Sequence, residues 1–201
     1  MYIAMRYLIF LLALLLMITG ISISSSYADE AEIRALLEER DQEIKEILGP
    51  EDRDYSEEER ERLKNIINDI VDYPSMARQA LDEKYEELSS EEQERFTELF
   101  SEVIRKQSMD QLDIYRAEVV YEEIEVDENS EAMVHTTSIH DGRRIPVKYK
   151  MTYRDGEWVI ADISVDEVWT AESYQRSFSR ILRRHGFDRL MESLEQRAAR
   201  G

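Results

Sequence analysis

The stretch DGRRIPVKYKMTYRDGEWVIADISV, residues 141–165, contains two Asp-Gly pairs on either side of an alternating pattern. From Ile145 to Tyr153 apolar residues alternate with polar ones, a period of two that is typical of a half-buried strand. Asp141-Gly142 and Asp155-Gly156 suit the positive-φ positions of two-residue hairpin turns. The stretch therefore predicts consecutive antiparallel strands that form a meander.

Two-residue turns also fix the register of the strands that they join. With both turns in place, we expect Tyr149 beside Val134 and Asp162, and Met151 beside Ile160. One face of the sheet would then carry Val134, Val147, Tyr149, Met151, Tyr153, Trp158 and Ile160.

Further strands and helices are predicted on both sides of this stretch. Strands are expected where Val120, Ile124 and Val126 alternate with acidic residues, and over about 132–140. Apolar residues recur at helical spacing in several other segments. The predicted helices cover about 30–48, 56–73, 74–88, 90–104 and 174–185, with a short last helix after Gly186. Helices, then a meander, then helices indicate an α+β fold.

Two serines suit the first positions of predicted helices. Ser56 is followed three residues later by Glu59, and Ser90 is followed by Gln93. Each pair matches a capping box, in which the two residues satisfy one another's backbone N–H groups. Helices are therefore expected to begin directly after Ser56 and Ser90.

Residues 1–28 have the features of a cleavable signal peptide. Arg6 precedes an apolar run over 7–23, and Ser26-Tyr27-Ala28 places small residues where a signal peptidase cuts, before Asp29. The alternative is an uncleaved anchor, for which the run is short. We expect export to the periplasm and removal of the leader.

Composition narrows the function further. The chain has 201 residues, which suffices for one domain, and a formal charge of −19 from 26 basic and 45 acidic residues. This charge argues against nucleic acid as a partner and against lasting residence on an anionic membrane. The chain contains no cysteine, which excludes disulfides and thiolate chemistry.

Catalytic and metal-binding motifs are weak. The three histidines, His135, His140 and His185, lack the spacing of a metal site, and no nucleophile elbow or P-loop is present. Asp162 beside Tyr149 could perform acid–base chemistry in an apolar pocket. Alternatively, Asp162 is a buried carboxylate bonded to that tyrosine or to a helix end. We therefore expect neither an enzyme nor a metal site.

One basic cluster stands out in this acidic chain. Arg180, Arg183 and Arg184 are followed directly by His185. They could meet the phosphate of a lipid headgroup. Alternatively, they complement the dipole at the end of a helix.

Five stretches, in this order, resemble the MlaC (toluene-tolerance) family of periplasmic phospholipid-binding proteins. They are YPSMARQAL (73–81), LSSEEQERF (88–96), DGRRIPVKY (141–149), DGEWVIADI (155–163), and SYQRSF (173–178) with the following ILRRHGFD (181–188). The family usually has a Gly-Arg pair after the leucine matching Leu81, where this chain has Asp82-Glu83. The resemblance extends over about 71–194.

The resemblance implies a fold and a function. The fold would be a curved antiparallel sheet of the NTF2-like kind, packed with a helical subdomain and with C-terminal helices. The helical subdomain would cover 29–115, and the sheet with the C-terminal helices would cover 116–201. The two parts would pack as one domain. The function would be that of a monomeric shuttle for phospholipid, the cargo rather than a cofactor. Its partners would be an inner-membrane MCE-domain ABC transporter complex and an outer-membrane lipoprotein complex, together maintaining outer-membrane lipid asymmetry. A related branch is associated with hopanoid biosynthesis, and an NTF2-like enzyme using Asp162 and Tyr149 is a further alternative.

On this reading, apolar side chains of the helices and the sheet enclose the acyl chains. The residues expected to line the cavity are Met76, Leu81, Phe96, Phe100, Val103, Ile104, Val134, Val147, Tyr149, Met151, Ile160, Tyr174, Phe178 and Ile181.

Overall fold

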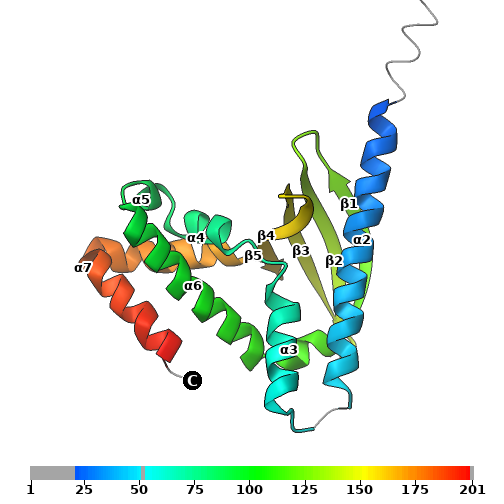
Figure 1. The fold of residues 1–201 in the computed structure, drawn as a ribbon, viewed down its shortest axis with the longest axis horizontal. Helices are drawn as coiled ribbons and strands as arrows, with labels where there is room; N and C mark the ends of the chain where they lie inside the picture. Colours follow the sequence, from blue (N-terminus) through cyan, green and yellow to red (C-terminus); the bar gives the residue numbers. More distant parts are fainter. Residues whose placement is uncertain (1–20, 51–52, 200–201) are drawn as a thin grey trace, which may run out of the picture.

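The computed structural model describes residues 21–50 and 53–199, with only the backbone described over 21–28. The elements follow the predicted order of helices, strands and helices, and the fold is α+β with a curved antiparallel sheet (Figure 1). The helices are α2 (Ile21–Leu48), α3 (Glu57–Asn68), α4 (Tyr73–Leu81), α5 (Glu83–Glu86), α6 (Ser90–Asp110), the 3₁₀ turn η1 (Leu112–Arg116) and α7 (Thr170–Ala199). The strands are β1 (Glu118–Val126), β2 (Glu131–His140), β3 (Arg143–Arg154), β4 (Glu157–Val165) and β5 (Val168–Trp169).

The strands form one antiparallel meander in the order β1-β2-β3-β4-β5. Both predicted hairpin turns are present, because Asp141-Gly142 and Asp155-Gly156 all have positive φ angles. Such angles match the right-handed twist of the flanking strands. The meander predicted from these two turns is confirmed.

A bulge in β4 changes half of the predicted register. Met151 pairs with Ile160 and Tyr149 pairs with Val134, as expected. The pairing then shifts by one residue, so that Tyr149 lies opposite Ile163 and Lys150 lies opposite Asp162. The expected pairing of Tyr149 with Asp162 is therefore wrong. Because paired residues share a face and neighbours alternate, Asp162 lies on the face opposite Tyr149.

A second bulge lies in β1. The pairing with β2 shifts between Tyr121 and Glu123, so Tyr121 and Ile124 share one face of the sheet. Val120 lies on the other face, although simple alternation places it with Ile124. A bulge leaves no clear signature in apolar alternation, which explains why the sequence pattern missed it.

Helix α2 covers one face of the sheet, where it runs alongside β1 (Figure 1). Ile33 and Leu37 pack there against Val134, Met151 and Ile160. Farther along α2, Ile44, Ile47 and Leu48 pack instead against α3. Helix α2 thus contacts the sheet through Ile33 and Leu37 and contacts α3 through its C-terminal end.

Helices α4, α6 and α7 pack together in a separate layer (Figure 1). Gly186 interrupts α7 with φ of 78° and ψ of −179°, as its place between two apolar patterns predicted. The second half of α7 then folds back over α6, where Leu190 and Leu194 are buried. The layer therefore combines helices that precede the strands in the sequence with the helix that follows them.

The helix expected over 74–88 is broken at Asp82. This residue has φ of 54° and ψ of −140°, a conformation that glycine adopts far more easily than aspartate. Helix α4 ends at Leu81, and the short α5 follows.

The connection between α3 and α4 attaches the helical layer to the sheet. Ile160 N donates to Ile70 O at 2.7 Å, and Asp72 N donates to Ile160 O at 2.9 Å. Asp72 is 7% exposed; it caps α4 through Ser75 N and pairs with Arg154 of β3 at 2.6 Å. These bonds set the start of α4 against the open side of β4.

Residues 1–20 of the leader predicted over 1–28 lie outside the described residues. Its last eight residues continue α2 in the N-terminal direction. Cleavage before Asp29 stays a prediction. Within the described ranges, no helix is both long and apolar enough to cross a bilayer.

One predicted capping box is present as expected, and the other lies one residue earlier in the chain. Ser56 and Glu59 form the predicted box at the start of α3. At the start of α6, Ser89 and Glu92 form the box, so the expected pair of Ser90 with Gln93 is wrong. Gln93 is engaged elsewhere, because its Nε2 donates to Tyr85 O at 2.9 Å.

This shift gives a direct test of the start of α6. Ser89→Ala removes the side chain that accepts from Glu92 N, and we expect it to lower the free energy of unfolding by about 1 kcal/mol. Ser90→Ala is the matched control and is expected to change it by less than about 0.5 kcal/mol. Urea unfolding followed by circular dichroism measures both. A larger loss in Ser90→Ala would contradict the assignment.

Candidate functional site

The residues expected to line a lipid cavity fall into two separate apolar clusters. The helical cluster lies between α4, α6 and α7, and the sheet cluster lies between the sheet and α2. The helical cluster holds Met76, Leu81, Phe96, Phe100, Val103, Ile104, Tyr174, Phe178 and Ile181. The sheet cluster holds Val134, Tyr149, Met151 and Ile160, while Val147 lies on the same face of the sheet.

Aromatic rings fill much of the helical cluster. Phe96 and Phe100 stack with centroids 5.8 Å apart, and Phe178 meets both edge-on at 5.9 and 6.0 Å. Tyr174 lies at the outer side of this group, 5.1 Å from Phe100, and its hydroxyl donates to Gln107 Oε1. Rings at these separations contact one another directly. The three phenylalanines therefore form packed core in this structure.

The predicted residues differ in how much surface they could offer a ligand. Met151 and Ile160 are only 2% and 4% exposed and pack against neighbouring side chains. Five members of the predicted set keep part of their surface accessible. These half-buried members are Ile104, Val147, Tyr149, Tyr174 and Ile181.

Sequence reasoning missed the residues that link or cover the clusters. Val71 packs against both clusters and forms a parallel bridge with Ile160. Ile33 and Leu37 close the sheet face from α2. Their helical spacing was visible in the sequence, but periodicity does not say which surface a helix covers.

The arrangement rules out the expected contact between Asp162 and Tyr149. The two side chains lie on opposite faces of the sheet because of the bulge in β4. Asp162 is 1% exposed, and its Oδ1 accepts from Ile163 N at 2.9 Å and from Ala171 N at 3.1 Å. Ala171 belongs to the first turn of α7. Asp162 therefore satisfies a helix end, which is the structural alternative stated above.

Burial controls the ionisation of these two residues. Burial raises the pKa of Asp162, although the N–H groups of Ala171 and Ile163 favour its charged form and oppose the rise. Burial also raises the pKa of Tyr149 to about 12. A phenol with that pKa is a poor proton donor or acceptor near neutral pH. The pair thus lacks the geometry that joint acid–base catalysis requires, because the two side chains lie on opposite faces of the sheet.

Substitutions at Asp162 test whether its carboxylate anchors the first turn of α7. Asp162→Ala leaves the N–H of Ala171 without its acceptor, and we expect a loss of about 1–3 kcal/mol in the free energy of unfolding. Asp162→Asn keeps an oxygen acceptor without a buried charge, so we expect a change below about 1 kcal/mol. Thermal and urea unfolding measure both. Equal, large losses in the two variants would contradict the capping role.

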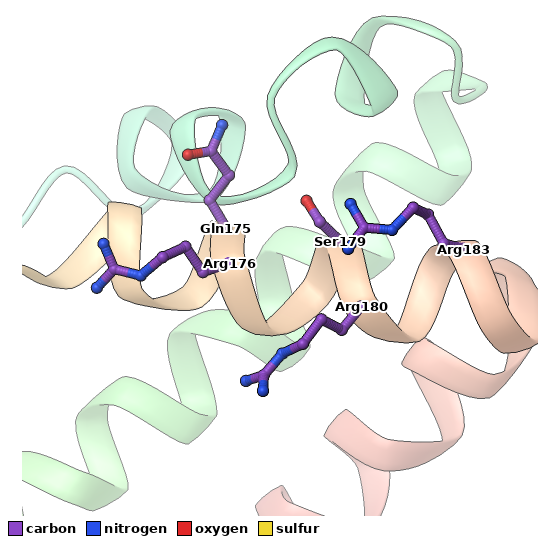
Figure 2. A pocket seen from close by; sticks show the side chains of 5 residues that line it. All are labelled: Gln175, Arg176, Ser179, Arg180 and Arg183. Atoms are coloured by element: carbon purple, nitrogen blue, oxygen red, sulfur yellow. The ribbon is translucent and has the colours of Figure 1, made fainter.

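A hollow of about 550 Å³ lies over the outward face of α7. Figure 2 shows its lining, which comes from this one helix: Gln175, Arg176, Ser179, Arg180 and Arg183. Gln175 extends toward α4, where its Nε2 donates to Asp82 Oδ2 at 2.8 Å. Two of the arginines singled out in the sequence, Arg180 and Arg183, therefore share this surface. Figure 2 also places Arg176 beside them, which the sequence cluster did not include.

The histidines do not gather. His135 lies near Glu125 at 4.0 Å, and His140 lies near Asp141 at 3.7 Å. Over the part of the chain that the structure describes, no group of three histidine or carboxylate side chains could hold a metal ion.

Comparison with known proteins gives a family and several solved structures of similar fold. The model of the family described as "MlaC protein" matches residues 38–196. A solved structure of the phospholipid-binding protein from Ralstonia solanacearum, in complex with a phospholipid, superposes with a TM-score of 0.68 at 17% identity. The superposition covers 84% of this chain and 96% of that one. No curated protein matches the sequence.

Proposed function

Because the chain belongs to the MlaC family, we propose that it is a periplasmic carrier that binds phospholipid and moves it between membranes. One observation carries the proposal. It is the family match over residues 38–196, and a similarity in fold to a phospholipid-bound protein, over 84% of this chain, supports it. A binding and transport role is favoured over an enzymatic one, since Asp162 caps α7 and faces away from Tyr149.

The energetics of such a carrier set its design. Each buried methylene is worth about 0.8 kcal/mol relative to water, so an acyl chain of about 16 carbons needs roughly 13 kcal/mol of apolar shelter. A carrier must nearly match the bilayer in this respect, or transfer stalls in one direction. Apolar clusters with an accessible side can supply this shelter without making or breaking a bond.

The half-buried members of the predicted set are the best candidates for contact with the tails. Ile104, Tyr174 and Ile181 belong to the helical layer, and Val147 and Tyr149 to the sheet. We propose that the tails enter between these two groups, on the side where Val71 links the clusters. The fully buried members, such as Phe96 and Met151, would support this site from behind.

The wider assignments are parts of the same proposal. The protein would be exported through a cleaved leader. It would exchange lipid with an MCE-domain ABC transporter complex and with an outer-membrane lipoprotein complex. It would act as a monomer with one domain, built from 29–115 and 116–201. A hopanoid-type lipid is the second cargo that family membership allows. An adaptor with a solid core is the competing interpretation, because the fully buried side chains are closely packed.

The first test is native mass spectrometry of the full chain purified from the periplasm of expressing cells. We expect a bound phospholipid, released on denaturation and identified after organic extraction. The measured N-terminus also shows whether the leader was removed before Asp29. A protein that is empty, and that takes up no lipid from vesicles, would favour the adaptor.

A matched pair of variants tests the position of the tails. Val147→Glu places a carboxylate at a half-buried position on the sheet face beside Tyr149, and Val120→Glu places one at a half-buried position on the opposite face. A carboxylate excluded from water opposes binding by well over the about 1.4 kcal/mol that corresponds to tenfold. We therefore expect lipid content to fall at least about tenfold in Val147→Glu only.

Circular dichroism confirms that both variants remain folded before lipid is counted. Met151→Glu is a poorer probe, because Met151 is buried in core and a charge there unfolds the protein. Equal lipid content in the two valine variants would place the tails elsewhere.

A further inference from the structure

We propose that the outward face of α7, defined by Arg176, Arg180 and Arg183, docks the protein reversibly onto an anionic phospholipid bilayer. The three arginines follow one another at i, i+4 and i+7, so they share one face of the helix. At 1.5 Å per residue they span about 10 Å along the axis. They line the hollow in Figure 2.

The charges on this face are available to a partner. All three arginines are exposed. Arg176 pairs with Glu172 of its own helix at 2.5 Å. Neither Arg180 nor Arg183 has a carboxylate within ion-pair distance in the part of the chain that the structure describes. Most of the positive charge is therefore not neutralised internally.

The hollow over the arginines differs in the charge of its lining from a second hollow, of about 300 Å³, beside the C-terminal half of α7. That hollow has one arginine among several carboxylates, and its lining is Glu92, Arg95, Phe187, Asp188, Met191, Glu192 and Glu195. In a chain with a net charge of −19, mixed or acidic surfaces are the expected background. The hollow over α7 has arginines and no carboxylate in its lining, which makes it a specific exception.

The chemistry of the face fits phosphate. A guanidinium group donates two parallel hydrogen bonds to phosphate oxygens, and it is less strongly hydrated than an ammonium group. Ser179 adds a hydroxyl between the arginines. The amide of Gln175 is held by Asp82, which fixes this side of α7 against the end of α4.

A row of cations along an exposed helix matches the flat surface of a bilayer better than a closed ligand pocket. The choice of a bilayer rests on the proposed function, because the two complexes that such a carrier would meet lie in membranes. The remaining acidic charge is screened beyond about 8 Å at physiological ionic strength. Docking is therefore weak and salt-sensitive, as a carrier that must leave again requires.

The experiment measures binding of the full chain, as the cell processes it, to sedimented vesicles of phosphatidylcholine with or without one quarter phosphatidylglycerol. Each arginine near an anionic surface contributes about fivefold in affinity, so Arg180→Gln with Arg183→Gln is expected to weaken binding about 30-fold. The matched control is Arg143→Gln with Arg144→Gln. This control removes the same charge from exposed residues at the start of β3.

The expected result is binding that requires phosphatidylglycerol, falls with added salt, and is lost in the α7 variant but kept in the control. An equal loss of binding in both variants overturns the proposal. The absence of vesicle binding by the unaltered chain also overturns it, and then leaves an acidic protein as the partner of this face. Native mass spectrometry of the same samples keeps the two proposals apart. Lipid carried by a protein that docks without these arginines overturns only the docking face, while an empty protein that docks through them overturns only the carrier.

Discussion

A one-residue bulge at Ala161 in β4 sets how the sheet and the helical layer are joined. On its N-terminal side, Ile160 faces the sheet cluster and binds the backbone of Ile70 and Asp72. On its C-terminal side, the bulge turns Asp162 to the opposite face, where it holds the first turn of α7. A regular strand would place both side chains on one face, and α7 would lose its buried anchor. One irregular residue thus connects the sheet to both ends of the helical layer.

This connection keeps two apolar clusters apart instead of merging them into one core. The sheet cluster is closed by α2, and the helical cluster is filled by aromatic rings from α6 and α7. The half-buried side chains of the two clusters, where the tails are proposed to bind, are the ones a ligand could reach at little cost to packing. The same anchored helix carries the arginine face on its other side. The part of α7 before the break at Gly186 would then couple the proposed apolar site to the surface proposed to meet the membrane.

Asp82 adopts an unfavourable backbone conformation that the packing of the helices requires. Its positive φ is unfavourable for a residue with a side chain, by an amount on the order of 1 kcal/mol. The break lets α4 end where the chain turns toward α6, and the carboxylate gains a hydrogen bond from Gln175 of α7. The backbone conformation is therefore set by the packing of the helices and not by the residue that adopts it.

The local elements could be predicted from the residues alone. They are the hairpins at Asp141-Gly142 and Asp155-Gly156, the cap at Ser56, the kink at Gly186, the α+β order and the family. Each depends on neighbours along the chain, whose chemistry is visible in the letters. The sequence missed the bulges, the partner of α2, the break at Asp82 and the division of the predicted lining into two clusters. These features depend on contacts between segments that are distant along the chain. A bulge is favoured by what packs on each face of a strand, and a buried side chain is core or lining according to neighbours distant in sequence.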